Sequence, residues 1–284
     1  MKVLCCQIQI ENVTTRDAME HHQTRIEELV RQAAAREAFD LVLLPELSAI
    51  DYSLPAFENL AELANPHDGW LTERMGQLAR DVNAYVCFGG PLIDDSKHSI
   101  AQWVVDRDGH LIGHYKKVHL AQFGASTEKP YFVGGDHILV FDIDDFRFGV
   151  VICYDMRFGQ YISKIVDEHQ VHIMLHPVAF SDDGSFASWR SFVCTRALEN
   201  NIYWLSLNRA GDGWGHSVFC PPWFESESEV VSLGEAEELY RVELDHEKLR
   251  YAKETYPIGY DRLSDYTRLK TYVMDNDHRK KSLR

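Results

Sequence analysis

The chain has 284 residues, 45% of them hydrophobic, with a formal net charge of -15 and a pI of about 5.3. This length fits one large domain or two small ones with a sizeable core. The acidity argues against nucleic acid and anionic membrane surfaces as partners, because phosphate groups bind to basic faces. No apolar run approaches the roughly 18 residues that span a membrane. The opening MKVLCCQIQI predicts a strand and not a signal peptide.

The chain has six cysteines, and none of them belongs to a CxxC pair. Most lie in apolar runs such as LCCQI and YVCFG, where a buried free thiol is the ordinary interpretation. The spacing therefore predicts no zinc cluster and no thioredoxin-like motif, and it favours a reducing, cytoplasmic location. The cysteines are Cys5, Cys6, Cys87, Cys153, Cys194 and Cys220.

Two hydrophobic periods alternate along the chain. Apolar residues recur at helical spacing over 16–39, whereas LVLLP at 41–45 is a continuous apolar run, typical of a strand buried on both faces. Residues 106–109 (DRDG) predict a tight turn between two strands. In chain order we expect a strand at 3–9, a helix at 16–39, a strand at 41–45, a helix at 69–83, strands at 84–90, 100–106, 111–118 and 146–153, a helix at 158–169, a strand at 171–177, a helix at 186–200, a strand at 201–208, and then short strands and a helix at 246–254.

Strands that alternate with helices indicate an α/β layered fold. The mixture of hairpins and crossovers indicates a mixed sheet and not a purely parallel one. No repeat, low-complexity run or long linker divides the chain, so we expect a single domain.

Three polar residues stand where predicted buried strands end. Glu46 follows LVLLP, Lys117 lies in HYKKVHL, and Cys153 ends FRFGVVIC. Strand ends are where sites assemble in layered α/β folds. Taken singly, each residue has an ordinary structural explanation: a glutamate in a loop, a lysine on an exposed edge, a cysteine in the core. Their joint occurrence favours one shared site.

These residue types suit nucleophilic attack on a carbonyl carbon. A carboxylate can take the proton of a thiol, whose usual pKa of about 8.5 leaves little thiolate at neutral pH. An ammonium and a backbone N–H can stabilise the oxygen that becomes negative after the attack. The same carboxylate can protonate the leaving amine and then activate water.

The segments that carry these residues resemble the nitrilase, or carbon–nitrogen hydrolase, superfamily. The resemblance runs from the first strand to about Tyr266. It rests on LLPELS, HYKKVHL and VVICYDMRFG, with EKPYFVGGD at 128–136 and RALENNIYWLSLNRAG at 196–211. All of these segments occur in family order, each on the expected element.

The resemblance implies an α/β fold of four layers, an αββα sandwich with two mixed β-sheets. It implies a hydrolase domain at 1–266 and a C-terminal tail at 267–284, with an oligomer contact as one role for the tail. It also implies a homodimer or a larger even homo-oligomer, with no cofactor.

For the site, the resemblance implies Glu46 as general base and acid, Lys117 as oxyanion stabiliser and Cys153 as nucleophile. The Tyr154 backbone N–H would complete the oxyanion hole, and Glu128 would orient Lys117 and the substrate. The rival lysine is its neighbour in YKKV, but side chains alternate along a strand, so only one of the two can face the site. The match to KVHL selects Lys117.

The residues after the cysteine indicate a branch of the superfamily. True nitrilases tend to carry Trp-Glu there, whereas YDMRF at 154–158 is similar to the amidase and omega-amidase branches. We therefore expect an amidase that cleaves a small aliphatic amide through a thioester and releases ammonia and a carboxylic acid. An N-carbamoyl amino acid hydrolase is the second choice and a nitrilase the third. A non-catalytic binding or scaffold protein of the same fold is the alternative from another class.

Substrate contacts are less well defined by the sequence. Arg157 suits a substrate carboxylate, but a structural ion pair with Asp155 or another acid is the favoured interpretation. Histidines at 169, 172 and 176 suggest a metal site, and on a strand His172 and His176 could share one face; no third ligand has suitable spacing, so no metal is expected. The other candidate substrate contacts are Tyr52, His176, Ala179 and Phe180, and for each of them a plain core or loop role is favoured over substrate binding.

Two segments do not fit the family pattern. CPPWF at 220–224 replaces the usual Asp-Pro and glycine turn, which leaves the hairpin at 218–226 and the nearby pocket edge or subunit contact unassigned. SDDGS at 181–185 has no assigned place. Other catalytic classes lack their motifs: the chain has no G-x-S-x-G and no P-loop, and a Cys–His pair would leave the Glu and Lys motifs unexplained.

Overall fold

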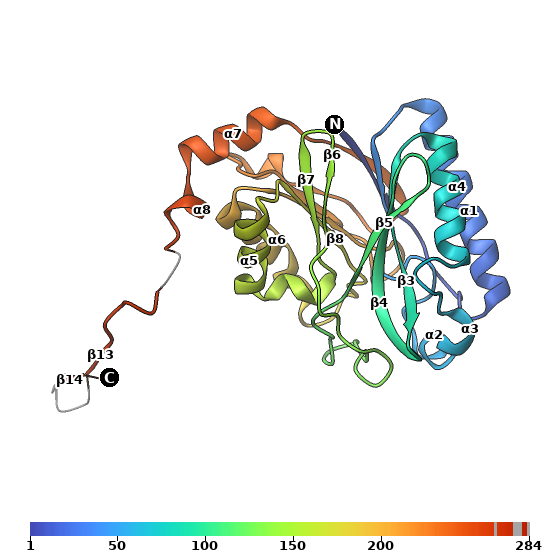
Figure 1. Ribbon diagram of the computed structural model, residues 1–284, viewed down its shortest axis with the longest axis horizontal. Helices are drawn as coiled ribbons and strands as arrows, with labels where there is room; N and C mark the ends of the chain where they lie inside the picture. Colours follow the sequence, from blue (N-terminus) through green and yellow to red (C-terminus); the bar gives the residue numbers. More distant parts are fainter. Residues whose placement is uncertain (264–265, 275–279, 283–284) are drawn as a thin grey trace.

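A computed structural model describes residues 1–263, 266–274 and 280–282. Within them the chain forms two six-stranded mixed sheets that pack face to face, with helices on both outer sides (Figure 1). This is the expected four-layer αββα sandwich. The predicted domain boundary adjoins residues 264–265, and the predicted tail includes 275–279 and 283–284. These positions lie outside the described residues, so the division at 266 stays a prediction.

The first sheet has the strand order β12-β1-β2-β3-β4-β5. Its central pairs, β1 with β2 and β2 with β3, are parallel, whereas the outer pairs are antiparallel. The edge strand β12, which comes late in the chain, thus pairs with β1, the first strand. The bounds are β1 (Lys2–Gln7), β2 (Leu41–Leu43), β3 (Tyr85–Asp94), β4 (Lys97–Val105), β5 (Leu111–Lys116) and β12 (Glu238–Glu243).

The second sheet has the order β11-β10-β9-β8-β7-β6, again with parallel pairs at its centre. A separate pair, β13 (Tyr272–Met274) with β14 (Lys280–Ser282), lies away from the sandwich in Figure 1. The remaining bounds are β6 (Val140–Ile143), β7 (Phe146–Val150), β8 (Ile173–Pro177), β9 (Tyr203–Leu207), β10 (Val218–Cys220) and β11 (Val231–Ser232).

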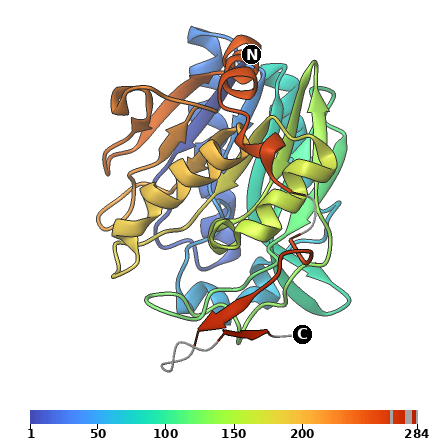
Figure 2. The same cartoon turned by 90° about the vertical axis from the view of Figure 1, so that its left-hand side faces the viewer.

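The helices form the two outer layers. α1 and α4 cover the first sheet, and α5 and α6 lie across the outer face of the second (Figures 1 and 2). The helices are α1 (Arg16–Arg36), α2 (Leu54–Glu58), α3 (Leu60–Leu63), α4 (Trp70–Val82), α5 (Gly159–His169), α6 (Trp189–Asn200), α7 (His246–Thr255) and α8 (Ile258–Asp261), with 3-10 helices η1 (Cys153–Arg157), η2 (Phe186–Ser188) and η3 (Glu227–Glu229).

Local sequence explains where the outer helices begin and end. The Thr15 side chain accepts a hydrogen bond from the Ala18 N–H and so caps α1. α4 ends at Asn83, which adopts a left-handed conformation with φ 51°. The buried residues of α1 recur every three or four positions, so one face packs on the sheet. The helices expected at 16–39 and 69–83 are therefore confirmed to within a few residues.

One hairpin was missed by the sequence prediction. β3 and β4 form a continuous antiparallel pair from Val86 opposite Val105 to Asp94 opposite Lys97. The two residues of its tight turn, Asp95 and Ser96, both have positive φ, as a two-residue hairpin of the primed type requires. The prediction ended the first strand at 90, began the second at 100, and assigned no structure to the residues between them. The hairpin predicted around 106–109 is confirmed.

Candidate active site

Glu46 lies in the turn that follows β2, and its side chain is fully buried. One carboxylate oxygen accepts the Ala179 backbone N–H at 2.7 Å, and the other receives the Lys117 ammonium at 2.8 Å. The next residue, Leu47, has a φ of 48°, a conformation that costs a branched residue free energy. Burial raises the pKa of Glu46, and the Lys117 charge opposes that rise.

Lys117 directly follows β5 and is fully buried between two carboxylates. Its Nζ lies 2.8 Å from Glu46 Oε1 and 2.6 Å from Glu128 Oε1. Burial alone would lower the pKa of Lys117, but Glu128 and Glu46 outweigh it and raise that pKa well above its usual value. The neighbouring Lys116 instead lies 3.5 Å from Asp94, so the two lysines do face opposite ways.

Glu128 is fully buried, and both of its carboxylate oxygens accept hydrogen bonds. Its Oε1 accepts the Tyr52 hydroxyl at 2.7 Å as well as Lys117, and its Oε2 accepts the Ala121 N–H at 2.8 Å. Tyr52, predicted from its closeness to Glu46 in sequence, therefore reaches the same group of side chains. Burial and Glu128 raise the pKa of the Tyr52 hydroxyl, which keeps it protonated and able to donate.

Cys153 begins η1, three residues after β7 ends. Its φ of 44° places a non-glycine residue in the left-handed region, which marks a sharp turn at the strand end. The charges of Glu46, Lys117 and Glu128 all act on the Cys153 sulfur. Burial first, and then Glu46, raise the pKa of Cys153 well above its usual value, so the resting side chain is a thiol.

The turn at Cys153 is held by Asp155, which is fully buried. Its carboxylate accepts the backbone N–H groups of Ile152 at 3.1 Å and His119 at 2.8 Å. It also accepts the Tyr115 hydroxyl at 2.8 Å and meets the His119 ring at 2.8 Å. These contacts join the turn after β7 to the segment that carries Lys117, although the two are far apart in sequence.

A small hollow opens beside Cys153. Tyr154, Ala179 and Phe180, three of the predicted site residues, lie on its wall together with Cys153. Ser181, Asp183 and Ser185 of the unassigned SDDGS segment also line it. The segment therefore belongs to the mouth of the candidate site. The unusual 220–224 segment begins at the last residue of β10 and does not line this hollow.

Two predicted contacts differ in the structure. Arg157 forms no ion pair with Asp155 or another acid among the described residues, because Asp155 is occupied by Tyr115 and His119. The Arg157 guanidinium lies over the rings of Phe180 and Phe192 and reaches the Ser188 hydroxyl at 3.3 Å.

His176 is fully buried behind the turn, and both of its ring nitrogens are occupied. Nδ1 meets the Ser206 hydroxyl at 2.8 Å, and Nε2 meets the Cys153 carbonyl at 2.9 Å. Burial lowers the pKa of His176 to about 4. No ring nitrogen is left for a substrate, so the side chain supports the backbone of Cys153 instead.

Arg209 was not singled out from the sequence. It follows β9, is fully buried, and its Nη2 lies 3.2 Å from the Glu46 carbonyl and 3.5 Å from those of Leu47 and Ile50. Asp51 is its ion partner at 3.5 Å, and burial lowers the pKa of Arg209 to about 10. The criterion that selected Glu46, a charged residue shortly after a buried strand, also applies to Arg209 and would have identified it.

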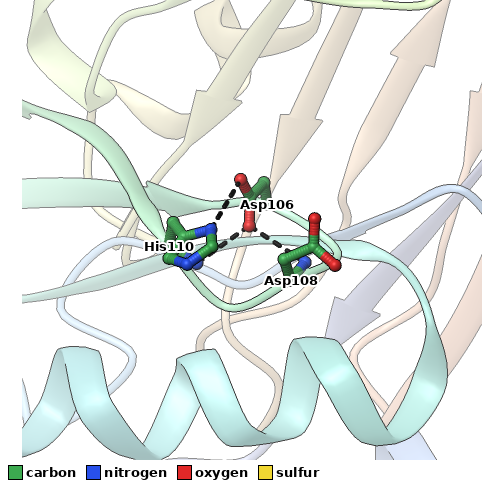
Figure 3. Close-up of side chains that lie close together, drawn as sticks. All are labelled: Asp106, Asp108 and His110. Atoms are coloured by element: carbon green, nitrogen blue, oxygen red, sulfur yellow. Dashed lines mark hydrogen bonds and ion pairs between the residues drawn. The ribbon is translucent and has the colours of Figure 1, made fainter.

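A group of acidic and histidine side chains lies at the turn between β4 and β5, where Asp106, Asp108 and His110 are close together (Figure 3). Asp106 Oδ1 accepts the backbone N–H groups of Asp108 at 3.0 Å and His110 at 2.8 Å. The carboxylate thus closes the turn, as Asp commonly does. Exposed acidic side chains in this arrangement do not by themselves indicate a metal site.

None of the helices that the structure describes is both long and apolar enough to cross a membrane.

Comparison with known proteins covers nearly the whole chain. Omega-amidase NIT2-A of Xenopus laevis is 30% identical over 249 residues, which cover 84% of this chain and 87% of that protein. Human omega-amidase NIT2 is 29% identical over 254 residues, covering 85% and 89%. The crystal structure of Saccharomyces cerevisiae Nit3, a nitrilase-superfamily protein, superposes with a TM-score of 0.80 at 24% identity, covering 95% and 97%. The family model described as carbon-nitrogen hydrolase matches residues 2–254, and the chain belongs to that family.

Proposed function

We propose that this carbon–nitrogen hydrolase is a thiol amidase, which cleaves the C–N bond of a small aliphatic amide and releases ammonia and a carboxylic acid. One observation carries the proposal: a fully buried ammonium, Lys117, lies between the carboxylates of Glu46 and Glu128, and its charge acts on the Cys153 sulfur. Burying three charged groups costs desolvation free energy even when they are paired. Charged groups that are buried at this cost cluster at catalytic sites.

The geometry supports the following first half-reaction. Glu46 takes the Cys153 proton as the sulfur attacks the amide carbon, and a C–S bond forms. The carbonyl oxygen becomes negative beside the Lys117 ammonium and the Tyr154 backbone N–H. Glu46 then passes its proton to the amide nitrogen, the C–N bond breaks, and ammonia leaves a thioester on Cys153.

Water completes the cycle. Glu46 takes a proton from water, the hydroxide attacks the thioester, and the acid leaves as the Cys153 thiol is restored. The raised pKa of Glu46 suits this double role, because a carboxyl group whose pKa is nearer neutrality both takes and gives protons readily. Glu128 takes no proton in this scheme; it holds Lys117 in place.

We further propose that the substrate carries a carboxylate at the end away from the amide. The curated relatives NIT2-A and NIT2 are omega-amidases, and Arg157 offers a suitable cation near the hollow. Its Nε is buried without a hydrogen-bond partner among the described residues, and its guanidinium adjoins Phe180 of the hollow wall. A guanidinium with an unused N–H is well suited to bind a carboxylate.

The test is an ammonia-release assay over paired substrates. Each pair has one monoamide of a dicarboxylic acid and one neutral amide of equal length, with N-carbamoyl amino acids and nitriles beside them. Cys153→Ala is expected to abolish turnover while the far-UV spectrum stays native, and Cys87→Ala, which removes another buried thiol, is the control. Acid-quenched wild type is expected to carry the acyl group on Cys153 by mass spectrometry. Full activity in Cys153→Ala would overturn the proposal.

The same panel separates the alternatives. Turnover of N-carbamoyl amino acids alone would make the protein a carbamoylase, and turnover of nitriles alone a nitrilase. No turnover of any compound, with no adduct on Cys153, would indicate a non-catalytic member of the fold. Arg157→Met is expected to raise KM for the carboxylate-bearing amide about tenfold and to leave the neutral amide unchanged. Equal effects on both members of a pair would exclude a carboxylate contact.

We also propose that the protein forms a homodimer or a larger even oligomer. Large apolar side chains beyond α7 are exposed, which is typical of interaction surfaces. Light scattering of the full chain, compared with a chain that ends at 263, tests whether the later residues contribute. The exposed side chains in this stretch are Ile258, Tyr260, Leu263, Tyr266 and Leu269.

A further inference from the structure

The hollow beside Cys153 is too small for a substrate as it stands. Its free volume is about 20 Å³, and a space of this size holds about one water molecule. Even a short aliphatic amide is several times larger than a water molecule. Part of the wall must therefore move before a compound reaches the sulfur, and the contacts of the wall show which part that is.

One side of the wall is held firmly from behind. Cys153 and Tyr154 belong to the turn that Asp155 fixes. Phe180 donates its backbone N–H to the Asn208 side chain at 2.9 Å, and its carbonyl accepts the Asn208 amide at 2.8 Å. This side follows shortly after strands of the second sheet, so we expect it to stay in place.

The other side is a loop, residues 121–126, here called the entrance loop. Its base is fixed, because Glu128 accepts the Ala121 N–H at 2.8 Å. Its tip is exposed to solvent, and there the ring of Phe123 lies 4.9 Å from the ring of Tyr154. The residues of the entrance loop that line the hollow are Ala121, Phe123 and Ser126.

Among the described residues, a single hydrogen bond joins the tip of the entrance loop to a distant part of the chain. The Ala125 backbone N–H donates to Asp183 Oδ2 at 3.3 Å. Asp183 belongs to the 181–185 segment, which also lines the hollow. Its other oxygen, Oδ1, accepts the Ser185 N–H at 2.8 Å and the Ser185 hydroxyl at 2.7 Å. The carboxylate is therefore fixed within its own segment and holds the entrance loop through one oxygen.

Gly124 makes this contact possible. It has a φ of 57°, and a Cβ atom at this position would lie 2.0 Å from Asp183 Oδ2. The carboxylate thus occupies the space that a side chain would fill. Burial alone would raise the pKa of Asp183, but hydrogen bonds from Ser185 and Ala125 help to lower it below its usual value. The side chain is therefore charged at neutral pH, which strengthens its hydrogen bonds.

We propose that Asp183 is a positioning residue that clasps the entrance loop over Cys153, and that a compound reaches the sulfur only while this clasp is open. The clasp favours compounds small enough for the loop to close over them, because closure restores the hydrogen bond between Ala125 and Asp183. Loops that close over a bound substrate also keep water out of the site. The proposal concerns access to Cys153, so it holds whether an amide, an N-carbamoyl compound or a nitrile reacts there.

The test measures the rate at which iodoacetamide alkylates Cys153 in the full chain. Trypsin places Cys153 on peptide 148–157 and Cys87 on peptide 81–97, so mass spectrometry follows each thiol separately. Cys87 is fully buried in β3, and its alkylation reports general unfolding. In Asp183→Ala we expect alkylation of Cys153 about tenfold faster than in wild type, the factor that corresponds to the loss of one hydrogen bond to a charged group. Alkylation of Cys87 is expected to stay unchanged.

Further variants separate the clasp from the charge of Asp183. Gly124→Ala keeps the carboxylate but places a methyl group against it, so it is expected to match Asp183→Ala. Asp182→Ala removes an exposed charge whose side chain has no hydrogen bond among the described residues, and is expected to match wild type. Gly184→Ala, where a Cβ meets nothing within 4 Å, is the control for Gly124→Ala. Asp183→Asn keeps one acceptor oxygen and is expected to be intermediate.

Hydrogen exchange identifies the part that moves. In Asp183→Ala, amide exchange is expected to rise in peptides that cover the entrance loop and to keep the wild-type rate in those that cover β8. Equal alkylation of Cys153 in Asp183→Ala and Asp182→Ala, an equal rise at Cys87, or unchanged exchange in the entrance loop would overturn the proposal. None of these measurements requires turnover, so their failure leaves the amidase proposal standing, and a chain without amidase activity would still give them.

Discussion

The Nε2 nitrogen of His176 lies 2.9 Å from the backbone carbonyl oxygen of Cys153. A carbonyl only accepts, so Nε2 carries the proton and Nδ1 accepts from the Ser206 hydroxyl at 2.8 Å. The Ser206 oxygen in turn accepts the Trp189 indole N–H at 2.9 Å. This chain of hydrogen bonds needs a neutral imidazole, and it holds the backbone of a residue with positive φ.

The neutral His176 predicts a pH-dependent stability. Its pKa falls from 6.5 to about 4 on folding, so between these values the unfolded chain binds the proton and the folded one does not. The stabilisation is therefore present above pH 6.5 and is lost as pH falls towards 4; it is on the order of 3 kcal/mol. In urea unfolding, His176→Asn is expected to be less stable than wild type at pH 7.5, with the gap narrowing towards pH 4. A gap that stays constant across this range would contradict the assignment.

Gly89 on β3 predicts a second effect on the Glu46 turn. A Cβ atom at Gly89 would lie 2.5 Å from the Pro45 carbonyl oxygen and 2.7 Å from the Leu47 nitrogen, both backbone atoms. Gly89→Ala must therefore move that turn, and we expect a loss of about 1–3 kcal/mol of stability together with most of the activity.

Gly90→Ala is the matched control for this substitution. A Cβ there would approach the Leu71 side chain at 3.0 Å and no backbone atom of the turn. The terminal methyl of Leu71 can shift, so we expect activity close to wild type. Equal losses of kcat in both variants would show that the turn is not the cause.

The buried carboxylates around Lys117 predict that the stability of the fold depends strongly on the Lys117 ammonium. Lys117→Met leaves Glu46 and Glu128 facing each other without a cation, and we expect a loss of about 3–5 kcal/mol in the free energy of unfolding. Adding Glu128→Gln removes one of the two unpaired carboxylates and is expected to restore part of that stability. Urea denaturation of the single and double variants measures the coupling. Purely additive losses would show that the two side chains do not interact.

Arg209 predicts an effect on catalysis from a side chain that acts through the backbone. Arg209→Met removes the donor to the carbonyls of Glu46 and Leu47, so the Glu46 side chain loses its fixed position. Since small misplacements are costly, we expect kcat to fall about 10- to 100-fold with little change in KM. Arg209→Lys keeps the charge but not the planar fork, and is expected to be intermediate. A change confined to KM would assign Arg209 to substrate binding instead.

Much of the architecture was predictable because the buried strands are short and continuous in sequence. LVLLP and FRFGVVIC mark strands whose ends carry Glu46 and Cys153, and local pattern alone places these residues at element ends. What local pattern cannot supply is contact between distant segments. Tyr52 reaches Glu128 across 76 positions, and Asp155 meets Tyr115 across 40.

The wrong ion pair for Arg157 has the same physical origin. Asp155 is its close neighbour in sequence, but tertiary contacts with Tyr115 and His119 satisfy that carboxylate first. The missed β3–β4 hairpin is different, because its turn uses Asp95 and Ser96 in a conformation that glycine or asparagine more often adopts. Here tertiary pairing overrides a weak local signal.

The residues of the candidate site come from both six-stranded sheets. Glu46 and Lys117 follow strands of the first sheet, whereas Cys153 and Ala179 follow strands of the second. We therefore expect the rate of hydrolysis to depend on how closely the two sheets pack against each other. When heat or denaturant begins to separate the two sheets, we expect ammonia release to stop while the circular dichroism signal of the strands persists. Activity would then be lost at a lower temperature or denaturant concentration than secondary structure.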